Sequence, residues 1–286
     1  RSEPDKTPKF KDYPHLFECM NVTNEWGTLI KCDTVGALND IISEGRIKRL
    51  ILLQEALHES RMGEIAAKIK DKGSRFVMIA GPSSSGKTTF SHRISVQLMA
   101  RGLNPRTIAL DDYFLDREKT PLDKDGNKDY ECLEALNVEL LNNQLVDLFN
   151  GKEIIVPTYD FHSGTAYFED KNKMTLKNNE ILIMEGIHGL NDKLTPKVAP
   201  ELKFKIYLSA LTQLNLDDHN RISTSDNRLI RRIVRDNNFR GKPAAGTIEM
   251  WPSVRRGEEL HIFPFQNNAD AILNTALDYE LSVLRV

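Results

Sequence analysis

The sequence of 286 residues has little cysteine, no long apolar run and almost no net charge. Its cysteines, Cys19, Cys32 and Cys132, are odd in number and lack CxxC spacing, which predicts neither a disulfide framework nor a zinc site and favours a reducing cytoplasm. Apolar runs such as Leu50 to Leu53 are far too short to cross a bilayer. The formal net charge of -2 argues against nucleic acid as the main partner, so any site for an anion must be local.

Composition and patterning divide the chain into two expected parts. The 40% hydrophobic content suits a folded core, and neither repeats nor low-complexity tracts occur. Residues 1–72 are expected to form a small accessory region, mostly helical, with breaks near Gly45 and Gly63. The chain begins at Arg1 with a polar, proline-containing stretch, residues 1–8. We interpret the chain as a fragment or processed form, and residues 1–72 as the tail of an upstream domain.

From residue 73 onward, apolar runs of strand length alternate with helical patterns. The expected strands are Phe76–Ala80, Thr107–Leu110, Ile181–Met184 and Phe204–Leu208, and the clearest helices are Thr88–Arg101 and Glu134–Phe149. This alternation predicts an α/β domain over residues 73–286, with a parallel sheet flanked by helices. Ligands of such sheets bind beyond the carboxyl ends of the strands, where the motifs below begin.

A glycine-rich run follows the first expected strand and opens a helix. It matches G-x-x-x-x-G-K-[ST] completely, so backbone N–H groups and the helix N-terminus are expected to face the phosphates of a nucleoside triphosphate. Lys87 would reach the β- and γ-phosphates, and the Thr88 hydroxyl would coordinate Mg²⁺. The expected nucleotide-binding residues of this loop are Gly81, Ser83, Ser84, Ser85, Gly86, Lys87, Thr88 and Thr89.

Acidic residues follow two of the expected strands. Asp111 is placed to accept a proton from an attacking hydroxyl, while its neighbour Asp112 would point elsewhere; the alternative for Asp111 is a loop cap. Glu185 ends an apolar strand, a pattern that supplies a carboxylate to a Mg²⁺ shell. A GTPase is not supported, because the sequence has neither an Asp-x-x-Gly switch after a strand nor an Asn-Lys-x-Asp base reader.

Arg228, Arg231, Arg232 and Arg235 recur at helical spacing and share one face of a helix. Like charges on one face repel, and a polyphosphate crossing that face would relieve the repulsion. The alternative is a solvated charged face.

Two further signals are weaker. Residues 123–134 place oxygen-bearing side chains nearly as in an EF-hand, but Lys128 stands where the sharp turn requires glycine. We therefore interpret this stretch as a substrate loop that supplies Tyr130 and Glu131. His188, after the strand that ends in Glu185, either touches substrate or is structural.

Taken in order, GPSSSGKTT, LDDYF, DYECLEALN, PTYDF, LIMEGIHGLN and NRLIRRIVRD resemble the uridine kinase/phosphoribulokinase family of P-loop kinases over roughly residues 75–286. The likeness is greatest to a nucleoside-kinase-like branch with a threonyl-tRNA-synthetase-like N-terminal region, because residues 33–59 look like the tail of such a region. The resemblance implies transfer of the γ-phosphoryl group of ATP, with Mg²⁺, to the 5′-hydroxyl of a nucleoside such as uridine or cytidine.

The resemblance also implies roles for single residues. Asp111 would activate the acceptor hydroxyl, Glu131 would hold the ribose hydroxyls beside Tyr130, and Tyr159 and Phe161 would lie near the base. The basic residues that it places at substrate, phosphates and lid are Arg232, Arg235, Arg240 and Lys242. The base-reading positions depart from the family pattern and carry Gly164, Ala166 and Met250.

Alternatives to a nucleoside kinase remain open. One keeps the chemistry but takes another hydroxylated metabolite, such as a sugar phosphate. Another is a regulatory nucleotide-binding module with weak catalysis. In each case the expected partners are small molecules, with neither membrane nor nucleic acid, and a homo-oligomer is an open alternative.

Overall fold

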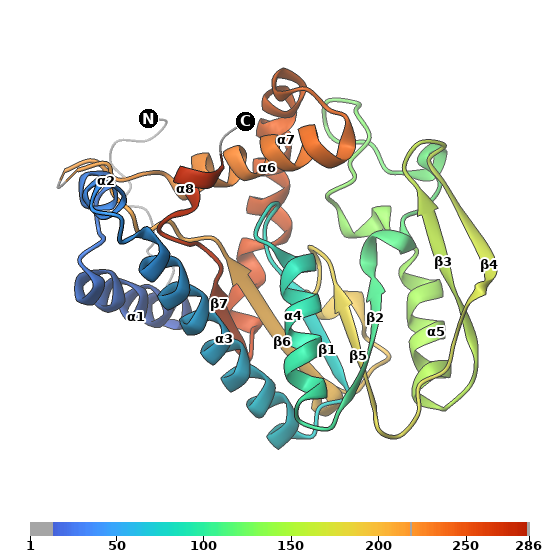
Figure 1. Ribbon diagram of the computed structural model, residues 1–286. Coiled ribbons are helices and arrows are strands. Elements are labelled where there is room, and N and C mark those ends of the chain that lie inside the picture. The colour runs from blue at the N-terminus through green and yellow to red at the C-terminus, as the bar shows by residue number, and fades with distance from the viewer. Residues whose placement is uncertain (1–13, 218, 285–286) are drawn as a thin grey trace, which may run out of the picture.

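The computed structural model describes residues 14–217 and 219–284, so the polar stretch 1–8 lies outside the described residues. Its centre is a five-stranded sheet in the order β2-β5-β1-β6-β7, and every neighbouring pair is parallel (Figure 1). The strands are β1 (Phe76–Ala80), β2 (Asn104–Ala109), β5 (Glu180–Glu185), β6 (Lys203–Ser209) and β7 (Ala271–Asn274). The expected parallel α/β fold is confirmed.

Helices cover both faces of this sheet because successive residues of a strand point to opposite sides. Phe76 and Met78 enter a core shared with α5 (Val138–Phe149). Val77 and Ile79 enter a second core, which is covered by α4 (Lys87–Met99) and α3 (Ile47–Lys72). Strands buried on both faces are the continuous apolar runs that the sequence shows.

The N-terminal helices are α1 (Pro14–Ile30), α2 (Val35–Ser43) and α3. The expected break near Gly45 is present, since Gly45 has φ 72° between α2 and α3. The expected break at Gly63 is wrong, because α3 runs through it; a Cβ there would lie 3.2 Å from Arg101 Nη2, so glycine permits close approach to the segment that ends α4. The second half of α3 buries Met62, Ile65, Ala66 and Ile69 in the core of the sheet.

Two elements differ from their expected bounds. Leu110 does not extend β2 but begins a 3-10 helix, Leu110–Tyr113. The helix expected from Glu134 begins at Val138, because the side chain of Asn137 caps it by accepting a hydrogen bond from the Leu140 N–H at 3.1 Å.

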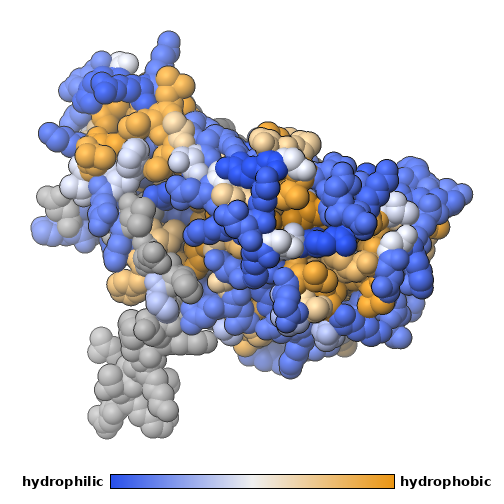
Figure 2. All heavy atoms as spheres, turned by 90° about the horizontal axis from the view of Figure 1, so that it is seen from below, coloured by the Kyte–Doolittle hydropathy of each residue, from blue (hydrophilic) through white to orange (hydrophobic). Residues whose placement is uncertain are grey.

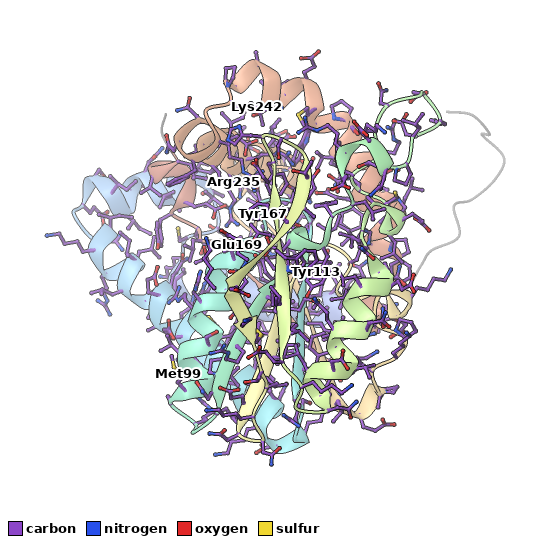
Figure 3. All side chains as sticks on the ribbon, turned by 90° about the vertical axis from the view of Figure 1, so that its right-hand side faces the viewer. Met99, Tyr113, Tyr167, Glu169, Arg235 and Lys242 are labelled. Atoms are coloured by element: carbon purple, nitrogen blue, oxygen red, sulfur yellow. The ribbon has the colours of Figure 1, made fainter. Side chains whose placement is uncertain are left out.

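A hairpin and three helices complete the fold around the carboxyl end of the sheet. The hairpin consists of β3 (Ile154–Asp160) and β4 (Thr165–Met174), and it stands beside α5 in Figure 1. Helices α6 (Thr224–Arg240) and α7 (Ala244–His261) precede β7, and the short α8 (Glu280–Val283) follows it. In Figure 3, Arg235 and Lys242 lie near one end of the molecule and Met99, the last residue of α4, near the other.

The surface is mainly hydrophilic where Figure 2 shows it, with several separate apolar areas. Among the described residues, no helix combines the length and apolar character needed to cross a membrane.

Candidate active site

A cavity of about 960 Å³ opens at the carboxyl ends of the strands. Most of the expected site residues line it together: Ser83, Ser84, Gly86, Lys87, Thr88, Thr89, Asp111, Tyr130, Glu131, Tyr159, Phe161, Glu185, Arg232, Arg235 and Arg240. Gly81 and Ser85 belong to the same loop but are buried and do not line the cavity. The sheet brings these residues together because β1, β2 and β5 are neighbours that end at the same edge.

The loop between β1 and α4 has the backbone of a phosphate cradle. Gly86 has φ 83° and Ser84 has φ 59°, and such left-handed residues turn successive N–H groups toward one side. The first turn of α4, from Lys87, then presents N–H groups without an intrahelical partner. At the start of the loop, a Cβ on Gly81 would collide with the Leu208 carbonyl of β6, so glycine is required.

The polar atoms of this loop fit phosphate. The hydroxyls of Ser84 and Ser85 are buried and have no hydrogen-bond partner among the described residues. Lys87 Nζ folds back and donates to the carbonyls of Gly81 (2.9 Å) and Pro82 (3.3 Å). Burial lowers the pKa of Lys87, and the nearby Glu185 and Asp111 act in the opposite direction. An anion in the cavity would give the Ser84 hydroxyl a partner and would compete with the two carbonyls for Lys87 Nζ.

A pair of oxygen ligands lies beside the loop. Thr88 Oγ1 donates a hydrogen bond to Glu185 Oε1 at 2.7 Å. A hydroxyl and a carboxylate are hard oxygen donors, which suit Mg²⁺ when phosphate oxygens and water complete its shell. The described residues contain no cluster of three or more His, Cys, Asp or Glu side chains that could hold a metal ion by themselves.

The two adjacent aspartates point in different directions. Asp111 faces the cavity and is exposed to the solvent there. The protein atoms around it still raise its pKa by desolvation, while the charge of Lys87 opposes the rise. Asp112 does not line the cavity and accepts a hydrogen bond from the Tyr159 N–H at 3.4 Å. The geometry thus separates a cavity-facing carboxylate from one that holds the hairpin.

Aromatic side chains form one wall of the cavity. The ring of Phe114 lies 6.2 Å from Tyr130, 5.6 Å from Tyr159 and 6.4 Å from Phe161, measured between ring centroids. Tyr159 and Phe161 come from the end of β3 and its turn, so the unpredicted hairpin is what places them. Phe114 was missed in the sequence, although it follows Asp111 at the end of the same motif.

Glu131 lies next to this wall. Burial raises its pKa to about 7, while the charge of Arg232 acts against the rise. A Cβ on Gly257 would meet the Glu131 side chain, so α7 packs directly behind this carboxylate. Glu131 is therefore poised between its neutral and its charged form near neutral pH.

The arginine face of α6 corrects one expectation. It is not a solvated face, because Arg228 is 2% exposed and Arg232 is 9% exposed. Each arginine has an acidic partner, but Arg232 and Arg235 share Asp236, so the four charges are only partly neutralised and phosphate binding on this face stays a prediction. The pairs are Arg228–Glu258, Arg231–Glu280, Arg232–Asp236 and Arg235–Asp236. Arg228 is absent from the cavity lining, while the other three line it.

The two weaker signals do not become sites. Asp123 Oδ1 accepts the N–H groups of Asp125 (2.9 Å) and Asn127 (2.8 Å), so it closes a turn instead of facing a cation. His188 is buried, its pKa falls to about 4 because burial disfavours the charged ring, and it does not line the cavity. This position favours a structural role for His188 over contact with substrate.

Arg117 is a cavity residue that sequence reasoning missed. Its Nη2 donates to the carbonyl of Phe161 at 2.8 Å, and its backbone N–H donates to the Gly164 carbonyl at 2.7 Å. A Cβ on Gly164 would lie 2.6 Å from Arg117 Nε. The guanidinium therefore occupies the space of any side chain at position 164. No ion-pair partner for Arg117 occurs among the described residues, and no motif in the sequence indicates its position.

A phosphate-binding loop after the central strand of a parallel sheet, with carboxylates at the ends of the neighbouring strands, defines a P-loop phosphotransferase fold. The family model described as Phosphoribulokinase / Uridine kinase family matches residues 76–282. The chain belongs to this family, and it is a phosphotransferase with an alcohol acceptor.

Curated sequences agree with this family assignment. Curated uridine kinases from Staphylococcus aureus strains JH9 and Newman are each 31% identical over 205 residues, which cover 71% of this chain and 88% of theirs. The structure of D-glycerate 3-kinase from Cryptococcus neoformans covers 76% of this chain and 95% of its own, with a TM-score of 0.50 and 13% identity. At that identity the likeness shows the fold alone.

Proposed function

We propose that this protein transfers the γ-phosphoryl group of ATP to the 5′-hydroxyl of a nucleoside of the uridine or cytidine type. One observation carries the proposal: a single cavity joins the phosphate cradle, the Asp111 carboxylate and a wall of aromatic rings beside Glu131. Phosphoryl transfer needs mainly positioning and charge stabilisation, which this set of groups supplies.

Each group has a part in the proposed reaction. The loop N–H groups, Lys87 and Arg235 would hold the phosphates, and Thr88 with Glu185 would hold Mg²⁺, which neutralises phosphate charge when bound. Asp111 would orient the acceptor hydroxyl and take its proton. Its raised pKa makes it a stronger base than an aspartate of ordinary pKa.

The acceptor end suits a nucleoside in two ways. A carboxylate accepts hydrogen bonds from two neighbouring ribose hydroxyls, which is the role proposed for Glu131. The rings of Tyr130, Tyr159 and Phe161 offer a surface on which a base can stack. Arg232 and Arg240 would close the cavity from α6, together with Lys242.

A second acceptor class is favoured by Arg117. Its charge lies among the aromatic residues with no carboxylate paired to it among the described residues, and a guanidinium recognises phosphate well. An acceptor that already carries a phosphate group, such as a sugar phosphate, would meet this charge. With a neutral nucleoside bound, the charge of Arg117 would have no acceptor group to bind.

The deciding experiment is ADP release measured with uridine, cytidine and a panel of sugar phosphates, for the wild type and Arg117→Met. If the wild type turns over nucleosides faster than sugar phosphates, and Arg117→Met changes this rate little, the result supports the nucleoside proposal. If the wild type turns over sugar phosphates faster, and Arg117→Met abolishes that turnover, the result supports a phosphorylated acceptor. Tight nucleotide binding with no acceptor turned over would contradict both and favour a regulatory module.

A further inference from the structure

Glu258 lies in the last turns of α7 and is fully buried. Its side chain is 0% exposed and does not line the cavity. Three donors surround its carboxylate. Arg228 and Arg255 form ion pairs with its two oxygens, the latter at 2.9 Å. The third donor is the backbone N–H of Ser83, in the phosphate-binding loop, at 3.0 Å from Oε1.

The ion pair with Arg228 does not by itself explain a buried carboxylate. Burial raises the pKa of Glu258, and the charge of Arg228 opposes the rise. Removing two charges from water costs free energy, and apolar residues of similar size often serve as well or better for stability. An apolar pair could not, however, accept the N–H of Ser83. The hydrogen bond from the Ser83 N–H is therefore what Glu258 provides and an apolar residue would not.

Ser83 is also held from α6. Its hydroxyl accepts a hydrogen bond from Arg232 Nη1 at 2.7 Å, and the carbonyl of Ser84 accepts one from Arg231 Nη1 at 3.3 Å. The first half of the loop is thus fixed between α6 and α7, while the N–H groups from Lys87 onward remain free for phosphate.

We infer that Glu258 is a positioning residue that fixes the first half of the phosphate-binding loop against α7 before nucleotide binds. The inference rests on the nucleotide site proposed above. A loop held in its binding conformation loses less conformational entropy on binding, which strengthens affinity. The hydrogen bond to Ser83 therefore contributes to ATP affinity, apart from any effect on folding.

Two double variants separate the hydrogen bond from the ion pair. Arg228→Met with Glu258→Gln removes both charges but keeps an oxygen that can accept the Ser83 N–H. Arg228→Met with Glu258→Met removes both charges and the acceptor. We expect the affinity for a non-hydrolysable ATP analogue, measured by calorimetry, to fall roughly five- to tenfold from the first variant to the second. Glu249→Gln, at an exposed glutamate of the same helix, is the control that keeps wild-type affinity.

A purely structural role of Glu258 predicts equal affinities in the two double variants, and that result would overturn the inference. If neither variant folds, exchange of the Ser83 amide in the nucleotide-free wild type, followed by NMR, decides. Slow exchange supports the inference, whereas exchange at the rate of an unstructured peptide contradicts it. If the wild type itself did not bind the analogue, the proposed nucleotide site would be contradicted. That outcome is distinct from equal affinities in the two double variants, which contradict only the role of Glu258.

Discussion

The hydroxyl of Thr88 lies 2.7 Å from the carboxylate of Glu185, although the two residues are 97 positions apart in the chain. Thr88 belongs to the first turn of α4, and Glu185 is the last residue of β5. They meet because β5 pairs directly with β1, the strand that leads into the loop and α4. The parallel sheet thereby builds a two-oxygen site beside the phosphate cradle.

Glu185→Gln tests this pair as a Mg²⁺ site. A neutral amide binds Mg²⁺ more weakly than a carboxylate, so we expect the Mg²⁺ concentration for half-maximal turnover to rise about tenfold or more. The measurement is the rate of ADP formation as MgCl₂ is titrated at fixed ATP. Glu134→Gln, at an exposed glutamate, is the control. Unchanged Mg²⁺ dependence in Glu185→Gln would remove Glu185 from the metal site.

Lys87→Ala tests the cradle. Loss of a positive donor to the transferred phosphoryl group is expected to lower kcat by roughly two to three orders of magnitude. Lys87 also donates to two loop carbonyls, so a small decrease in melting temperature is expected as well. Lys68→Ala, at an exposed lysine of α3, is the matched control. A variant of Lys87 with full specific activity would contradict the assignment.

The sequence predicted those parts of the fold that local pattern determines. Strands such as Phe76–Ala80 are buried on both faces and appear as continuous apolar runs. Strand β4 was missed because Thr165–Met174 is mostly polar and half exposed, so it has no apolar periodicity. The break expected at Gly63 was wrong because glycine there serves contact between α3 and the end of α4, which only tertiary structure reveals.

The sequence predicted those site residues that belong to motifs at the ends of strands. Asp111 and Glu185 could be placed because parallel strands end at one edge. The partners of Arg228 and Arg231 could not, since Glu258 and Glu280 lie far along the chain from them. A helical spacing shows that charges share a face but does not show what that face packs against.

Ile69→Ala tests how far the kinase core extends toward the N-terminus. The expected boundary at residue 72 would place α3 in an accessory region, but Ile69 is 0% exposed in the core of the sheet. We propose that α3 folds with residues 73–286. Ile69→Ala is then expected to lower the free energy of unfolding by about 2–5 kcal/mol. Leu52→Ala, at a leucine of the same helix that is 71% exposed, should change it little.

The two variants are compared by urea denaturation of the whole chain, followed by circular dichroism. A single transition that shifts in Ile69→Ala supports a shared core. A separate transition for the N-terminal helices, with the main transition unmoved, would support a boundary at residue 72.

The pKa of Glu131 predicts a pH dependence of acceptor binding. Burial raises this pKa to about 7, so the carboxyl group is mainly neutral below pH 7 and mainly ionised above it. If the ionised form binds the ribose hydroxyls, the acceptor KM rises as the pH falls through 7, by roughly tenfold between pH 8 and pH 6. In Glu131→Gln the KM is expected to be high and nearly independent of pH. A wild-type KM that is flat over this range would assign another role to Glu131.

Asp111→Asn and Asp112→Asn form a matched pair, since each replaces a carboxylate by an amide of the same shape. Asp111 faces the cavity, so its variant loses the proton acceptor and is expected to lose roughly 10²- to 10⁴-fold in kcat.

Asp112 accepts the Tyr159 N–H, away from the cavity, and an amide oxygen can keep that bond; its variant is expected to stay within a few-fold of wild type. Binding of the ATP analogue should be preserved in both variants, because the loop holds the phosphates without either aspartate. Steady-state kinetics with saturating ATP and calorimetry with the analogue give the two readouts. A large loss in Asp112→Asn alone would make Asp112 the base. Full activity in both variants would mean that positioning without a base accounts for the transfer, because the cavity-facing Asp111 would then contribute nothing to turnover.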